Sequence, residues 1–339
     1  MVIIDGSTGE GGGQVLRTSL ALALATGTPF RIEKIRARRR KPGLMRQHLT
    51  AVQAAAAVGR ALVHGAETGS QTLTFEPRAL APGDYTFSVG TAGSATLVLQ
   101  TILPPLLRAA APSTITLEGG THNPWAPPFD FLERAFLPVV NRLGPRVTVA
   151  LERAGFYPAG GGRFVAAIAP APIAALTLCA RGEIVTRRVR GVVSNLSRGI
   201  AEREVRTALE LLNWSADAGQ IATVDGPGPG NVVVIEIGCE HAVEVCTGFG
   251  EVGVTSEAVA RRAVDDARRY LATDVPVGCH LADQLLPIMA LGQGGVFRTM
   301  TLSQHARTNA DVIRRFIDLD VDVVDESRDA VRVEMRVRG

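Results

Sequence analysis

The sequence predicts an α/β protein of the α+β type, built from three βαβαββ units and one smaller inserted α/β domain. Three observations support this prediction. Apolar helical segments recur along the chain, strand-like alternation follows them, and the spacing lengthens abruptly before the third copy. At 339 residues, with 46% hydrophobic and 20% charged residues, the chain has room for two or three globular domains.

Each unit opens with an apolar helical segment that carries a glutamine, at Gln14, Gln100 and Gln284. A second helical pattern follows in each unit, at 41–59, 123–144 and 304–319. Alternating apolar residues then predict strands at 61–65, 71–77, 146–155, 162–170 and 320–337. The repeating unit is therefore βαβαββ, which is too long for a solenoid repeat.

The spacing between units locates an insertion. Gly93 lies 50 residues after Gly43, whereas Ala282 lies 156 residues after Ala126. The extra stretch of about a hundred residues has its own β-α-β-β-α pattern, and insertion at an exposed turn costs little. We predict an inserted domain at 183–274, and a catalytic domain of three units at 1–182 and 275–339.

Composition excludes several classes of protein. The four cysteines form no CxxC pair, so neither a zinc knuckle nor a disulfide framework is indicated. No basic and apolar leader opens the chain and no run of about 18 apolar residues occurs, so we expect a cytoplasmic protein with no membrane partner. The net charge is only +3, but eight Lys and Arg residues gather within 31–46, which predicts a local anion site or a solvated face.

A glycine-rich loop with one carboxylate, Glu10, joins the first strand pattern to the first helix. The loop "GEGGGQ" lacks the Lys and Ser/Thr of a Walker motif, and Gln14 stands where a dinucleotide fingerprint needs a third glycine. The glycines alone are also compatible with a tight strand-to-helix turn.

His305 is the sharpest candidate for chemistry. It follows the strand-like stretch 296–303 and precedes a helix for which we expect Thr308 or Asn309 to be the N-cap. A strand end beside a helix start is a place where an anion can bind. The alternative is a buried structural histidine.

Seven motifs together resemble one family, the RNA 3′-terminal phosphate cyclases. In chain order they are "GEGGGQVLR", "KPGLMRQHL", "GTAGSATLVLQTILP", "GGTHNPWAPP", "GFYPAGGG", "HLADQLLP" and "SQHARTNADVI". The resemblance implies units like the C-terminal domain of a translation initiation factor and an insertion of thioredoxin-like topology. It also implies an ATP-dependent conversion of an RNA 3′-phosphate into a 2′,3′-cyclic phosphate, with release of AMP and pyrophosphate.

The resemblance also assigns roles to residues. His305 matches the nucleophile that forms a histidinyl-AMP, and Glu10 matches an acidic residue associated with Mg²⁺ or Mn²⁺ at ATP. The residues matching positions near the RNA phosphate are Arg17, Arg36, Arg39 and Gln47. The residues matching the nucleotide site are Gln100, Pro127, Phe249, His280, Leu281, Ala282, Asp283 and Gln284. Asp283 is expected to act in catalysis with Arg17, either orienting His305 or holding metal.

Two positions depart from the family pattern. His280 replaces a tyrosine common before "LADQ", which changes the expected stacking partner of the base. Arg38 replaces a glycine in the basic loop, so Arg38 is strained if that glycine requires a positive φ. The expected partners are ATP and an RNA with a 3′-phosphate end, with a homodimer left open. The alternatives are a non-catalytic RNA-processing scaffold, an enolpyruvyl-type transferase and a bare RNA-binding module.

Overall fold

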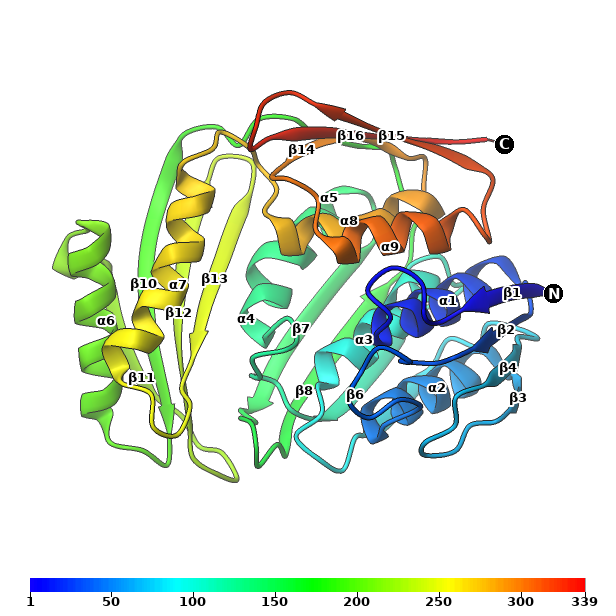
Figure 1. Ribbon diagram of the computed structural model, residues 1–339, viewed down its shortest axis with the longest axis horizontal. Coiled ribbons are helices and arrows are strands. Elements are labelled where there is room, and N and C mark those ends of the chain that lie inside the picture. The colour runs from blue at the N-terminus through cyan, green and yellow to red at the C-terminus, as the bar shows by residue number, and fades with distance from the viewer. Residues whose placement is uncertain (339) are drawn as a thin grey trace.

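The computed structural model describes residues 1–338 and has the predicted α+β fold (Figure 1). Three of its four-stranded sheets have the same strand order. In each, the first strand is parallel to the second, the second is antiparallel to the fourth, and the fourth is antiparallel to the third. Each sheet is accompanied by helices in the same chain order, so the three units share one topology.

The first unit spans the N-terminal part of the chain. Its elements are β1 (Val2–Asp5), α1 (Gly13–Thr26), β2 (Phe30–Glu33), α2 (Arg46–Gly59), β3 (Leu62–His64) and β4 (Leu73–Glu76). Helix α1 is buried on nearly all sides because other helices enclose it. It stops at Gly27, whose φ of 68° an L-residue adopts only at a cost.

The second unit follows the same plan. Its elements are β5 (Asp84–Ser88), α3 (Ala95–Leu106), β6 (Ser113–Gly119), α4 (Phe129–Phe131), the π-helical turn η1 (Leu132–Phe136), α5 (Leu137–Arg142), β7 (Arg146–Arg153) and β8 (Gly162–Ala169). Ser94 caps α3 by accepting a hydrogen bond of 3.2 Å from the amide of Leu97.

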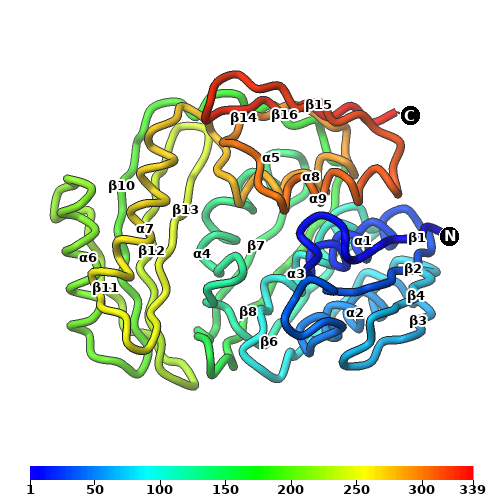
Figure 2. The backbone as a smooth tube through the Cα atoms, viewed as in Figure 1, coloured from blue at the N-terminus to red at the C-terminus, as the bar shows by residue number. Residues whose placement is uncertain are grey.

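The third unit is divided in the sequence. Its elements are β9 (Leu176–Leu178), α8 (Cys279–Leu291), β14 (Gly295–Thr299), α9 (Gln304–Ile313), β15 (Leu319–Asp325) and β16 (Val331–Val337). The chain leaves this unit after β9 and returns at α8, as the backbone path in Figure 2 shows. Across the three units, helix α1 contacts α3, α8 and α9, and α8 contacts α3 and α9, with the sheets outside these helices.

The fourth sheet lies in the inserted segment. Its elements are β10 (Ile184–Ser194), α6 (Arg198–Leu212), the 3₁₀ turn η2 (Ala216–Ala218), β11 (Gly219–Thr223), β12 (Gly230–Cys239), β13 (Val243–Phe249) and α7 (Ser256–Leu271). Strand β11 was missed, because "GQIAT" is short and lies at the sheet edge, where alternation is weak. The boundaries 183–274 and the thioredoxin-like description stay predictions.

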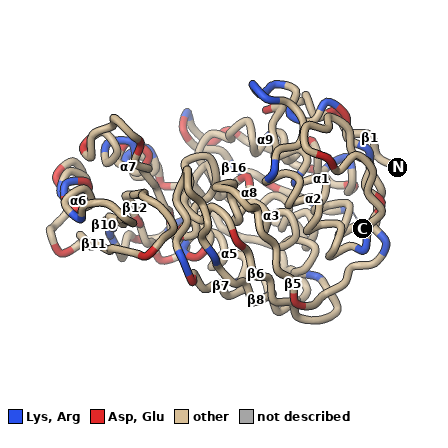
Figure 3. Tube along the Cα trace, turned by 90° about the horizontal axis from the view of Figure 1, so that it is seen from below, with Lys and Arg blue, Asp and Glu red and all other residues tan. Residues whose placement is uncertain are grey.

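The inserted sheet packs on both faces. In β12, Val233, Ile235 and Ile237 join an apolar core with α6 and α7, whereas Val232 and Val234 join the core of the three units. This alternation is the period of two that a strand imposes. Figure 3 shows charged residues along α6 and α7 and few on α1 and α3, because the former pair is exposed on one side. No helix within residues 1–338 is long and apolar enough to cross a membrane.

Candidate active site

A cavity of about 600 Å³ lies between the helices of the three units and the inserted sheet. It is lined by segments that are far apart in the sequence, from the loop before α1 to the start of α9. Twelve of the predicted site residues line it: Glu10, Arg17, Arg36, Arg39, Gln47, Gln100, Pro127, Phe249, His280, Asp283, Gln284 and His305. Leu281 and Ala282 do not line it, because both are buried in the apolar core under α8.

The loop before α1 places Glu10 at the cavity wall. Gly9 and Gly11 have φ angles of 57° and 58°, and a Cβ at Gly9 would overlap the Thr308 hydroxyl. The Glu10 side chain is only 7% exposed, and its Oε1 accepts a hydrogen bond of 3.2 Å from the amide of Gln14. Its Oε2 pairs with Arg39. The loop is therefore a close-packed support for one carboxylate.

His305 lies inside the first turn of α9, and the expected N-cap was wrong. Ser303 is the N-cap and accepts a hydrogen bond of 3.1 Å from the amide of Ala306. Thr308 and Asn309 are helical and buried instead, because their side chains bond to α1 and its loop. The helix therefore begins five or six residues earlier than predicted and carries His305 on its exposed end.

His305 faces Glu10. Its Nδ1 lies 3.9 Å from Glu10 Oε2, and its side chain is 48% exposed to the cavity. Partial burial lowers the pKa of His305, Glu10 opposes that effect, and Arg17 and Arg39 add to it. The imidazole is therefore neutral at neutral pH, which is the form that can act as a nucleophile. No side-chain hydrogen bond joins His305 to Asp283 within the described residues.

A buried polar relay fixes α9 against α1 and α8. Asn309 Oδ1 accepts hydrogen bonds from Thr18 Oγ1 at 2.6 Å and Gln14 Nε2 at 3.1 Å. Asn309 Nδ2 donates to the carbonyl of Asp283 at 2.8 Å. Arg17 in turn donates to Gln14 Oε1 at 2.7 Å. One amide thus connects the helices that carry His305, Arg17 and Asp283.

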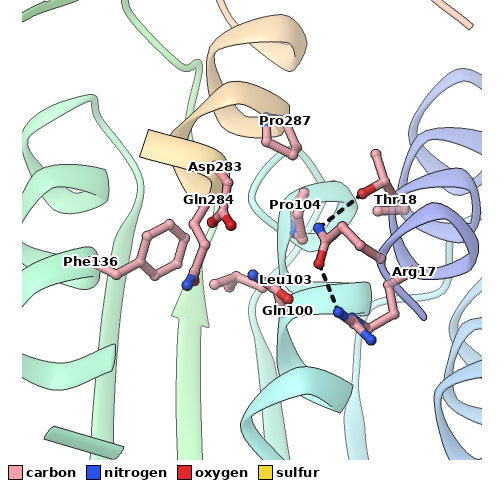
Figure 4. A pocket seen from close by; sticks show the side chains of 11 residues that line it. Arg17, Thr18, Gln100, Leu103, Pro104, Phe136, Asp283, Gln284 and Pro287 are labelled. Atoms are coloured by element: carbon pink, nitrogen blue, oxygen red, sulfur yellow. Dashed lines mark hydrogen bonds between the residues drawn. The ribbon is translucent and has the colours of Figure 1, made fainter. Parts of the chain in front are cut away.

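Two polar atoms that have no hydrogen-bond partner within residues 1–338 lie where α1, α3 and α8 meet. These are Arg17 Nε and Gln100 Oε1, both buried, and Figure 4 shows their side chains with Asp283 and Gln284 around a small pocket. Burial raises the pKa of Asp283 to about 7, while His280 and Arg17 hold it down. Unpaired buried donors and acceptors are costly, so this arrangement indicates a place for a polar ligand or water.

The basic loop is braced by its own arginines. Arg36 donates from Nη1 to the carbonyls of Lys41 and Gly43, both at 2.8 Å, and Arg38 donates to the carbonyl of Gly9 at 2.9 Å. The positive φ angles fall on Lys34 and Arg36, not on Arg38. The strain considered for Arg38 is therefore absent, and Arg38 packs over the Glu10 loop instead.

The far end of the cavity is formed by the inserted sheet. Pro127, Phe249 and His280 line this cavity, so they are available to surround a base. Glu244 also lines it, is 4% exposed, and has one oxygen without a partner. Burial raises the pKa of Glu244 to about 7, with His280 acting in the opposite direction.

Four residues of the site were not predicted from the sequence. His48 and Glu244 line the cavity, and the buried side chains of Thr308 and Asn309 hold α9 against α1 and its loop. His48 lines the cavity, and burial lowers its pKa to about 3, with Arg17 and Arg36 adding to the effect. The motifs containing His48 and Asn309 were recognised, but nothing in their spacing shows that these side chains are buried. Glu244 lies in an apolar strand pattern, where an isolated acid was a usable signal.

The residues can share a divalent cation with a polyphosphate, but they form no closed metal site. Within the described residues, no group of three or more His, Cys, Asp or Glu side chains could hold an ion. Glu10 supplies one carboxylate beside Arg17 and Arg39. Mg²⁺ is commonly held by one or two carboxylates together with substrate phosphates and water, so this donor set fits such a shared cation.

Comparison with known proteins gives a consistent family. The family model described as RNA 3′-terminal phosphate cyclase matches residues 8–323. A protein of that name from Koribacter versatilis (strain Ellin345) is 49% identical over all of this chain and 96% of its own length. Those from Ralstonia nicotianae and Ectopseudomonas mendocina are 50% and 45% identical, each over 98% of this chain and 96% and 97% of their own.

Among solved structures, the enolpyruvyl transferase NikO from Streptomyces tendae aligns with 98% of this chain and 48% of its own chain. Its TM-score is 0.37 and its identity 12%, values too low to support any argument about this molecule. The family model and the near-full-length relatives, by contrast, identify the family of this chain. This chain belongs to the RNA 3′-terminal phosphate cyclase family.

Proposed function

We propose that the protein uses ATP to convert an RNA 3′-phosphate into a 2′,3′-cyclic phosphodiester through a covalent histidinyl-AMP. One observation carries the proposal: His305, a neutral imidazole by its lowered pKa, shares a cavity with Glu10 and with Arg17 and Arg39. Nucleophile, carboxylate and cations are the groups that nucleotidyl transfer needs.

In the first step, His305 attacks the α-phosphorus of ATP. Because Nδ1 faces Glu10, Nε2 is the nitrogen available for attack. The Nε2–P bond forms, the bond to the bridging oxygen breaks, and pyrophosphate leaves. The imidazole ring becomes positively charged and keeps its Nδ1 proton beside the Glu10 carboxylate, which stabilises that charge.

Arg17 and Arg39 hold the phosphates during this step. Arg17 is buried and has Nε without a partner, so a phosphate oxygen can complete its hydrogen bonds. Gln100 and Gln284 line the same space and can contact the nucleotide. Bound at Glu10 with the phosphates, Mg²⁺ or Mn²⁺ supplies further neutralisation of the charge that develops on the leaving group.

The second and third steps use the RNA end. An oxygen of the RNA 3′-phosphate attacks the adenylate phosphorus, the P–N bond breaks, and His305 is regenerated. The neighbouring 2′-hydroxyl then attacks the activated 3′-phosphorus, the five-membered ring closes, AMP leaves, and the hydroxyl proton passes to water. Nucleophile and phosphorus already share a ribose, so proximity supplies most of this last step. Arg36 and Gln47, at the cavity wall, are positioned to hold the RNA phosphate.

The test is labelling with α-labelled ATP and Mg²⁺ or Mn²⁺, followed by denaturing electrophoresis and acid treatment. The wild type should carry an acid-labile label, and His305→Asn should carry none. His64→Asn, at an exposed histidine of β3, is the matched control and should label normally. Addition of RNA with a 3′-phosphate should release the label as AMP and produce a cyclic end. A wild type that never labels with either metal would favour the scaffold alternative.

A further inference from the structure

Two large aromatic rings stand exposed beside the cavity. Trp125 is 73% exposed and Tyr157 is 51% exposed, and their ring centroids lie 5.0 Å apart at an interplanar angle of 83°. Single exposed aromatic residues are common on protein surfaces. A pair is more informative here, because only 5% of the residues are aromatic and Trp125 lines the same cavity as His305.

The two rings come from motifs that the sequence comparison singled out, and neither ring has another assigned role. Trp125 lies in "GGTHNPWAPP" and Tyr157 in "GFYPAGGG". The two loops are joined at their bases, where the amides of Thr121 and His122 donate to the carbonyl of Gly155 at 2.9 and 3.0 Å. The amide of Gly155 donates back to Thr121 Oγ1 at 2.9 Å. The motifs therefore form one structural unit.

Buried contacts beneath the rings make this unit rigid. The His122 ring stacks on Phe156 with centroids 5.0 Å apart, and its Nε2 bonds to Asp130 at 2.9 Å. Asn123 accepts a hydrogen bond from the amide of Trp125 at 3.3 Å and donates to the carbonyl of Ala92 at 3.2 Å. The exposed rings are thus presented by a fixed support, which reduces the entropy lost when a ligand binds.

The surroundings identify the kind of ligand. Trp125 shares the cavity wall with Arg36, Arg39 and Gln47, the residues proposed to hold the RNA phosphate. Proteins that bind single-stranded RNA combine cationic groups for the backbone with aromatic side chains on which unstacked bases lie. A base attached to the ribose whose phosphate is bound at the arginines must lie within one nucleotide of that phosphate.

We propose that Trp125, supported by Tyr157, is a stacking platform for the nucleobase of the RNA's 3′-terminal nucleotide. This inference rests on the proposed function and adds a recognition site to it. Stacking accepts all four bases, because every base has a π-face, so the platform holds the RNA end without selecting its sequence. The competing occupant of the same wall is the adenine of ATP, and the experiment distinguishes the two.

The test compares two RNA oligonucleotides with a 3′-phosphate, one normal and one whose terminal ribose lacks its base but keeps its 2′-hydroxyl. For the wild type, kcat/KM for cyclisation should fall by roughly 5- to 150-fold on the abasic RNA, which corresponds to the worth of one base stacked on an aromatic side chain. For Trp125→Ala, kcat/KM on normal RNA should be lower than that of the wild type by a similar factor. Its kcat/KM should then be nearly the same on the normal and the abasic RNA. Trp125→Phe should retain most of the activity, and Trp214→Phe is the matched control.

Two results would overturn the platform. One is a wild type that cyclises both RNAs equally well. The other is a Trp125→Ala variant whose loss appears in the KM for ATP and not in the KM for RNA, which would assign the ring to adenine. If the wild type forms no adenylate at all, the proposed function fails separately. Stacking is then scored by quenching of Trp125 fluorescence by the 3′-phosphate RNA in a Trp214→Phe background, and absence of quenching rejects it.

Discussion

Helices α1 and α3 occupy the same position in units of the same topology, but they begin differently. Helix α3 is capped by its own Ser94 and carries no charged side chain. Helix α1 starts after Gly12 without a side-chain cap, its amide at Gln14 is bonded by Glu10, and it carries the buried Arg17. The first turn of α3 is thus bonded by the serine that precedes it, whereas the first turn of α1 is bonded by a carboxylate that lines the cavity.

The two helix starts differ in what a substitution there should change. A capped apolar helix is stable by itself within a packed layer, and substitution at its cap changes stability. A helix whose start is held by a carboxylate from a glycine loop depends on groups that also face the ligand. We therefore expect changes at the start of α1 to alter activity and changes at the start of α3 to alter stability.

The largest expected effect is at Glu10. Glu10→Ala removes the carboxylate that faces His305 and the cation site, so the rate of adenylation should fall by roughly 100-fold or more. Single-turnover labelling with ATP measures this rate. Glu33→Ala, at an exposed carboxylate paired with Arg31, is the matched control and should leave the rate unchanged. Near-normal adenylation by Glu10→Ala would remove Glu10 from the mechanism.

A smaller effect is expected at Asn309, which joins α9 to α1 and α8. Asn309→Leu removes the acceptor of the Thr18 hydroxyl and one of the two acceptors of Gln14 Nε2, so the free energy of unfolding should fall by about 1–3 kcal/mol. Because the relay positions the helix that carries His305, adenylation should also slow by about tenfold, with little change in the KM for ATP.

Thr101→Val is the control for Asn309→Leu. Thr101 is buried in α3 and donates only to the carbonyl of Leu97 at 3.0 Å. This variant should lower stability slightly and leave the adenylation rate intact. If Asn309→Leu loses stability but adenylates at the normal rate, the relay is structural only.

A change confined to stability is expected at Ser94. Ser94→Ala removes the cap of α3 and should lower the free energy of unfolding by about 1 kcal/mol, measured by urea denaturation. The adenylation rate of the folded variant should stay within twofold of the wild type, a margin of about 0.4 kcal/mol. A large loss of activity with unchanged stability would contradict the contrast between α1 and α3.

The smallest effect is a shift in the pH profile of adenylation. The pKa of His305 is lowered, so the neutral nucleophile persists below pH 6.5 and the rate should fall only at more acidic pH. Arg39 contributes to that lowering, so Arg39→Gln should raise the pKa and move the acid limb to higher pH. Arg40→Gln, at an exposed neighbour, should leave the limb in place; equal shifts in both variants would refute the assignment.

Much of the fold could be predicted from the sequence, because periodicity records which faces are buried. The recurring helices, the alternating strands and the long interval before Ala282 all follow from local patterns. The edge strand β11 and the start of α9 were not predicted correctly. Short edge strands have little alternation, and the N-cap of α9 was ambiguous because Ser303, Thr308 and Asn309 are all residues that can cap a helix.

The three-unit α+β fold class, the family and most of the residue types at the site could be predicted from local patterns and motifs. Three contacts are visible only in the folded chain: Glu10 faces His305, Asn309 joins three helices, and Trp125 meets Tyr157 beside the cavity. The physical reason is separation along the chain. Local patterns report burial within one element. The first two contacts instead join the first and third units, and the last joins two loops of the second unit, so all three distances are set by tertiary packing.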